Sequence, residues 1–152
     1  MMFTEFLFKD FLYSYRKTFS SFPNMENINQ NSFYTWSDFH YRRFMESFLY
    51  HLEPRREEKG VIIHDELDEV NEAIFIEIGT IDVGFEINRK QNFVMRLAQD
   101  VQIGSYNITF DKRSKYIFKT STVCMGFSIR RINWKSVIMD PDFEMITTPL
   151  KK

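Results

Sequence analysis

Residues 72–87 read EAIFIEIGTIDVGFEI, with apolar side chains at every second position on either side of Gly79. The parity of this alternation changes at Gly79: the apolar positions are Ile74, Ile76 and Ile78 before it and Ile81, Val83, Phe85 and Ile87 after it. A period of two is typical of a β-strand with one buried face. A change of parity at a glycine predicts two strands joined by a turn or a bulge.

Two further alternating runs follow this pair. The first comes after a predicted turn at 88–92 and contains Phe93, Met95 and Leu97. The second contains Val123, Met125, Phe127 and Ile129, and we expect the intervening Cys124, Gly126, Ser128 and Arg130 to face outward. No proline occurs between 54 and 141, as uninterrupted sheet requires. Several short strands in succession predict a β-roll or sandwich.

The residues before Pro54 have a different composition, because 16 of the 26 aromatic residues lie in 1–53. A helix is predicted at about 36–52, begun by Ser37 or Asp38 and ended by Pro54. Its apolar stripe recurs every three or four residues and contains Tyr41, Phe44, Met45, Phe48, Leu49 and Leu52. A weaker helix is predicted at about 3–19. A short helix, capped by Asn133, is predicted to end near Met139 because Asp140-Pro141 follows.

These patterns predict an α+β chain that is mainly β. We divide it into a helical, aromatic-rich segment at 1–53, a β-roll with a short terminal helix at 54–139, and a short tail at 140–152. The tail is too short and broken for another long helix.

Composition excludes several classes of function. The net charge of −1 gives no footprint for nucleic acid. The apolar runs near the N-terminus are far shorter than the roughly 20 residues of a membrane-spanning helix. A single cysteine, Cys124, fits a reducing, intracellular compartment. The histidines His40, His51 and His64 lack the spacing of zinc ligands. The acidic stretch 64–72 is interpreted as a surface loop between strands, and no motif argues for an enzyme.

Three segments resemble the cyclic-nucleotide-binding domain family. Residues 59–83 match its glycine, strand, acidic loop and strand; residues 101–122 stand where its phosphate-binding cassette belongs; residues 124–138 resemble its last strand and the helix that follows. The resemblance covers a little over half of the chain. It is nearest to the cytosolic module of ether-à-go-go, hyperpolarisation-activated and cyclic-nucleotide-gated cation channels, a group that includes potassium channels. The helix at 36–52 then resembles the end of the linker to a pore.

The resemblance implies a site for a cyclic nucleotide, cyclic AMP or cyclic GMP, and no other cofactor. In the family, a glycine-acid pair opens the cassette and the carboxylate binds the ribose, while an Arg-Ser/Thr pair binds the cyclic phosphate. These positions correspond here to Gly104, Ser105, Arg113 and Ser114, with a loop one residue shorter. Ser105 carries no carboxylate, and Lys115 stands where the family has a small residue. The family's long closing helix has no counterpart in the tail.

Three interpretations of Arg113, Ser114 and Lys115 follow: a solvated turn, a retained nucleotide site, or a pocket filled by the tail around Phe143–Met145. The function predicted is a non-catalytic, channel-related regulatory domain with weakened or lost nucleotide binding. The alternative is a scaffold or assembly subunit that uses the roll for interaction. The aromatic segment 1–53 favours a protein partner or self-association. Attachment to a membrane surface through 3–19 is a further alternative, with little basic charge to support it.

Overall fold

The computed structural model describes residues 39–98 and 101–147, and the chain divides into two compact units. One unit contains residues 52–135, and the other contains residues 1–51 with 136–152. The predicted helix at 3–19 and the predicted caps Ser37 and Asp38 lie outside the described residues. Among the described residues, no helix has the length and apolar content to cross a membrane.

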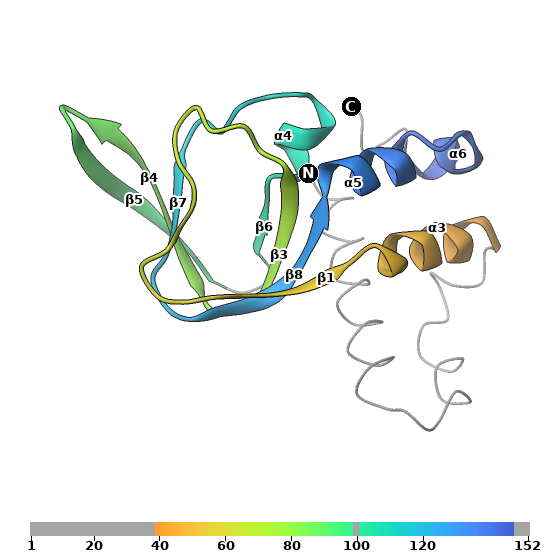
Figure 1. The fold of residues 1–152 in the computed structure, drawn as a ribbon, viewed down its shortest axis with the longest axis horizontal. Coiled ribbons are helices and arrows are strands. Elements are labelled where there is room, and N and C mark those ends of the chain that lie inside the picture. Colours follow the sequence, from red (N-terminus) through yellow and green to blue (C-terminus); the bar gives the residue numbers. More distant parts are fainter. Residues whose placement is uncertain (1–38, 99–100, 148–152) are drawn as a thin grey trace, which may run out of the picture. The chain divides into compact units, whose positions relative to one another are not determined.

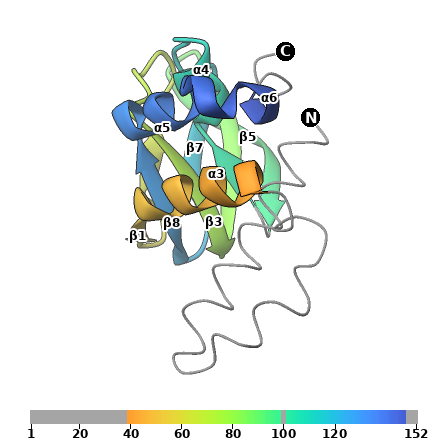
Figure 2. The same ribbon diagram turned by 90° about the vertical axis from the view of Figure 1, so that its right-hand side faces the viewer.

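The unit at 52–135 is built from two four-stranded antiparallel sheets (Figure 1). The first sheet has the order β1-β8-β3-β6, and Figure 2 shows β1, β8 and β3 side by side. Its strands are β1 (Glu53–Glu57), β8 (Cys124–Arg130), β3 (Glu72–Ile78) and β6 (Val101–Ile103). The second sheet has the order β2-β7-β4-β5. Its strands are β2 (Ile62–His64), β7 (Ile117–Thr120), β4 (Thr80–Ile87) and β5 (Lys90–Ala98). The predicted β-roll is confirmed.

The core of this unit is formed by apolar side chains from both sheets. Ile74 pairs with Ile103 and Ile76 with Val101, and all four side chains are buried together with Ile81 of β4. The alternation around Gly79 therefore predicts β3 and β4 correctly. It fails at the end of β3, where Ile78 is exposed.

The opposite face of β3 is also covered. Phe75 is buried, and its ring lies 6.4 Å from that of Trp134 in helix α5 (Arg131–Ile138). Because β8 lies beside β3, its two faces are covered in the same way. The prediction that Cys124 and Ser128 face outward is therefore wrong: both are buried, whereas Met125 is exposed.

The predicted turn at 88–92 is shorter in the structure. Asn88 and Arg89 both have positive φ, 51° and 62°, and connect β4 directly to β5 at Lys90. Two residues with positive φ form the type I′ turn that suits a two-residue hairpin. The alternating run Phe93, Met95 and Leu97 does lie in a strand, but β5 is the outermost strand of its sheet, and Phe93 and Met95 are exposed.

The beginning of α5 differs from the prediction. The helix begins at Arg131, directly after β8, and Asn133 lies inside it rather than capping it. The backbone N–H of Arg131 donates to the carbonyl of Asn71 at 2.7 Å, so that donor has a partner without a side-chain cap. The helix ends at Ile138, before Asp140-Pro141, as predicted.

The second unit contains helix α3 (Phe39–Tyr50), the 3₁₀ turn η2 (Pro141–Phe143) and the four-residue helix α6 (Glu144–Thr147). Helix α3 confirms the predicted helix at 36–52 in its central part. The buried rings of Phe44 and Phe143 meet edge to face at 5.5 Å. Asp140 caps η2 by accepting from the backbone N–H of Asp142. The predicted division of the chain into segments at 1–53, 54–139 and 140–152 stays a prediction.

Candidate functional site

The predicted cassette begins with Gly104, which lies between β6 and the short helix α4 (Ser105–Thr109). Gly104 has a φ of +85°, and a Cβ added to it would lie 2.5 Å from the carbonyl oxygen of Glu72 and 2.9 Å from Val70 Cγ1. Only glycine fits this close, left-handed connection. Ser105 forms the first turn of α4, where its carbonyl accepts from the Thr109 hydroxyl at 2.7 Å.

The other end of the cassette is bonded to the acidic loop between β2 and β3. Ser114 is only 2% exposed. Its N–H donates to the carbonyl of Asp68 at 3.0 Å, and its carbonyl accepts from the N–H of Leu67 at 2.9 Å. The guanidinium of Arg113 donates to the Leu67 carbonyl at 3.0 Å, and the Ser114 hydroxyl donates to the Tyr116 carbonyl at 2.7 Å. The chain itself thus provides partners for the two side chains that the resemblance assigns to a phosphate.

A surface hollow of about 410 Å³ lies at this junction. Three of the five predicted site residues, Arg113, Ser114 and Lys115, line it together with Glu66, Leu67 and Lys112. Gly104 and Ser105 are not among the lining residues. Sequence reasoning missed Leu67, which has a φ of 65° and is 70% exposed. Left-handed backbone is uncommon for a bulky residue, and no local sequence signal indicated it.

The hollow is basic on one side. Among the described residues, no carboxylate forms an ion pair with Lys112, Arg113 or Lys115. Glu66 on the other side accepts from the backbone N–H of Glu86 at 2.9 Å. The arrangement can hold an anion. The six lining side chains include no His or Cys and no paired carboxylates, so they offer no acid–base pair or activated nucleophile.

The structure bears on one of the three interpretations of Arg113, Ser114 and Lys115. A fully solvated turn is wrong for Ser114, because that residue is buried and bonded on both sides. The interpretation that the tail around Phe143–Met145 fills the pocket stays a prediction; within its own unit, the ring of Phe143 packs against Phe44.

A set of polar contacts joins the cassette to α5, and no sequence pattern indicated these contacts. The indole N–H of Trp134 donates to the Thr109 hydroxyl at 2.9 Å. Asp111, at the end of the segment that follows α4, accepts from Lys135 at 2.5 Å and also pairs with Arg131. The hydrogen bond from Lys135 has the largest effect on the Asp111 carboxyl, and the hydrogen bond from Arg131 adds to it. Both hold the pKa of this carboxyl below its usual range. These contacts connect the cassette to the first turns of α5.

His64, at the end of β2, is a buried titratable group beside this region. Its ring meets Phe118 edge-on, with 6.4 Å between centroids, and its Nε2 has no hydrogen-bond partner within the described part of the chain. Burial lowers the pKa of His64, against an opposing effect of the Glu72 charge.

Comparisons with known proteins identify the fold. No protein-family model and no curated protein matches the sequence. Among solved structures, the regulatory domain of Toxoplasma gondii PKA with cAMP matches with a TM-score of 0.59 and 9% identity, over 68% of this chain and 41% of that chain. A cAMP-bound PfPKA-R matches with a TM-score of 0.58 and 18% identity, over 63% and 34%. The regulatory subunit of a cAMP-independent protein kinase A from Trypanosoma cruzi, bound to guanosine, matches with a TM-score of 0.55 and 17% identity, over 72% and 43%.

The matched region spans less than half of each of these three chains. An EAL enzyme and an acyltransferase also contain the fold, which is therefore not restricted to non-catalytic chains. The identities show the fold alone. The chain has the two-sheet roll of cyclic-nucleotide-binding regulatory domains.

Proposed function

We propose that this chain is a non-catalytic regulatory domain of the cyclic-nucleotide-binding type whose affinity for cyclic AMP and cyclic GMP is weak or lost. One observation carries the proposal: the chain's own loop at 65–68 engages Arg113 and Ser114. A cyclic phosphate would have to displace the bond from Arg113 to Leu67 and the bond from Ser114 to Tyr116. Breaking these bonds would lower the gain from a charge-assisted contact.

The ribose side of the site supports the same conclusion. Ser105 replaces the carboxylate that the resemblance places after Gly104. A hydrogen bond to a charged group contributes about 1.5–3 kcal/mol. Its absence lowers affinity by about ten- to a hundredfold.

The connection from the cassette to α5 indicates how such a domain works without a nucleotide. Asp111 and Thr109 hold Lys135 and Trp134 in place, so a movement of the cassette would move the beginning of α5. A partner that binds the cassette or α5 would then shift the other. The Trypanosoma cruzi structure is the regulatory subunit of a cAMP-independent protein kinase A, which offers a parallel for regulation without cAMP in this fold.

The relation to cation-channel modules is part of this proposal and rests on the sequence resemblance of residues 54–138. Its test is whether the encoding gene continues into membrane-spanning segments. A protein partner of residues 1–53 stays a prediction, tested by whether deletion of 1–38 abolishes co-purification of that partner.

Isothermal calorimetry with cyclic AMP and cyclic GMP tests the proposal. We expect no saturable heat for the folded chain at ligand concentrations up to about 1 mM. A Kd of about 1 mM corresponds to a binding free energy of about −4 kcal/mol. Saturable binding below about 100 μM that Arg113→Ala abolishes would refute it. Lys59→Ala is the matched control, because Lys59 is exposed and lies outside the hollow.

A further inference from the structure

Strand β5 forms an open edge of the second sheet. In the order β2-β7-β4-β5 it is outermost, and within the described residues its strand partner is β4 alone. Eight of its nine residues are exposed, and the ninth, Leu97, is half-buried. The β4–β5 hairpin extends beyond the other strands of this unit in Figure 1. An unpaired edge presents a row of backbone donors and acceptors to another strand.

The centre of this edge is apolar. Phe93, Val94 and Met95 are consecutive and are 37%, 66% and 56% exposed. Ile87, near the end of β4, is also exposed. Exposed apolar residues at the centre of an open edge strand favour pairing with another strand.

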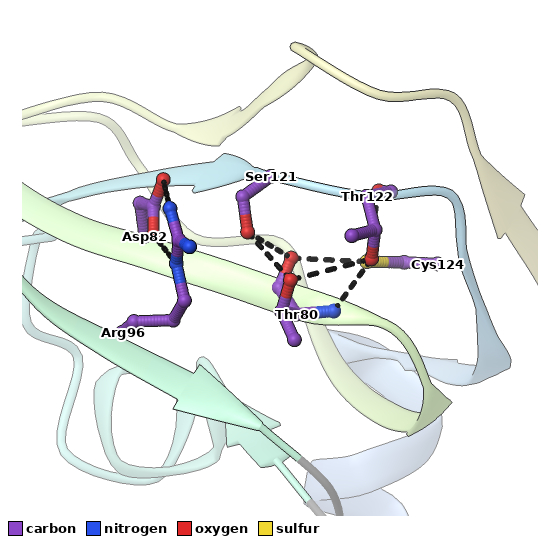
Figure 3. A network of polar contacts seen from close by, with 6 residues as sticks. All are labelled: Thr80, Asp82, Arg96, Ser121, Thr122 and Cys124. Carbon is purple, nitrogen blue, oxygen red and sulfur yellow. Dashed lines mark hydrogen bonds and ion pairs between the residues drawn. The ribbon is translucent and has the colours of Figure 1, made fainter.

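The charges that usually protect an edge strand are weak here. Arg96 is bound to Asp82 of β4 by two hydrogen bonds of 2.6 and 3.1 Å (Figure 3). Among the described residues, no carboxylate pairs with Lys90, at the beginning of the strand. One free cation at one end leaves the apolar centre open to pairing.

We propose that β5 pairs with β5 of a second copy of this chain, antiparallel and about a two-fold axis at Val94. Val94 is the midpoint of Lys90–Ala98, so this register pairs all nine residues. It sets Val94 opposite Val94 and Phe93 opposite Met95. The charged residues meet neutral ones, Lys90 opposite Ala98 and Arg96 opposite Asn92.

Neighbouring registers are less favourable. An axis at Phe93 sets Lys90 opposite Arg96, and like charges directly opposite each other destabilise a strand pair. An axis at Met95 leaves Lys90 and Gln91 without partners in the strand. The charge pattern and the strand length therefore select the same register.

A bulge lies at the centre of β5. Val83 pairs with Met95 and Gly84 with Phe93, so Val94 is the extra residue and the strand bends there. A two-fold axis at Val94 sets one bulge against the other, and the regular hydrogen bonds of the pair would lie on the two sides of Val94.

Disulfide trapping tests the register. At antiparallel pairs the Cα atoms lie about 4.5–5.5 Å apart, within the range that a disulfide spans. We expect Val94→Cys to form a covalent dimer under mild oxidation. Gln91→Cys is the matched control, because the two copies of residue 91 would lie about 20 Å apart at 3.3 Å per residue. Equal trapping of the two variants, or none of Val94→Cys, would overturn the proposal.

Light scattering tests the dimer itself. We expect the wild-type chain to approach twice its monomer mass as concentration rises, and Val94→Lys to remain monomeric. Ile132→Lys is the control, because Ile132 is 75% exposed but lies in α5; it should dimerise normally. A monomeric wild type, or a dimer that Val94→Lys leaves intact, would overturn the proposal.

Discussion

Substitution of Gly104 by alanine tests the close packing of the cassette against β3. An alanine at a φ of +85° bears the cost of a left-handed conformation, about 1–2 kcal/mol. Its Cβ would also lie 2.5 Å from the carbonyl oxygen of Glu72, which belongs to a paired strand and cannot move aside easily. Forced overpacking costs about 1–3 kcal/mol. Together these terms predict that Gly104→Ala lowers the free energy of unfolding by about 2–5 kcal/mol.

Gly60 provides the matched control. Its φ is +86°, nearly the same, but a Cβ added there meets no atom within 4 Å. Gly60→Ala should therefore lose only the conformational term, about 1–2 kcal/mol. Urea titrations followed by circular dichroism measure both variants. If Gly104→Ala is no more destabilising than Gly60→Ala, the packing of the cassette described here is wrong.

Three further predictions concern side chains with shifted pKa values. Asp111→Asn should speed amide hydrogen exchange in the first turn of α5, since the contacts to Lys135 and Arg131 weaken; unchanged exchange there would contradict the coupling. The stability of the chain should fall below about pH 6.5, because His64 has a pKa below its usual value in the folded state and takes up a proton more readily when unfolded. In urea titrations across pH, His64→Gln should flatten this decline, and an unchanged slope would count against it. Burial raises the pKa of the Cys124 thiol, so iodoacetamide should react with it only after unfolding; rapid labelling of the folded chain would disprove its burial.

Strands β3 and β4 were predictable from the apolar alternation on either side of Gly79. Ile74, Ile76 and Ile81 follow the period of two and lie in the core. The period fails where both faces are covered, as at Cys124 in β8, because a strand buried on both sides has no polar alternation to detect. It also fails in β5, where apolar residues form an exposed edge.

The resemblance singled out Arg113 and Ser114, and both residues line the hollow. It did not indicate which groups they bond to. Their partners are remote in sequence: Arg113 donates to Leu67, 46 residues earlier, and Asp111 binds Lys135, 24 residues later. Such contacts depend on the folded path of the chain, and no local spacing encodes them.

The hydrogen bonds that join the cassette to α5 are expected to form whether or not a nucleotide is bound. Amide hydrogen exchange of residues 105–118 and 131–138, with and without about 1 mM cyclic AMP, tests this expectation most directly, since exchange reports local opening. We predict the same protection in both conditions. Exchange that is rapid in the free chain and slows only when cyclic AMP is added would contradict the account.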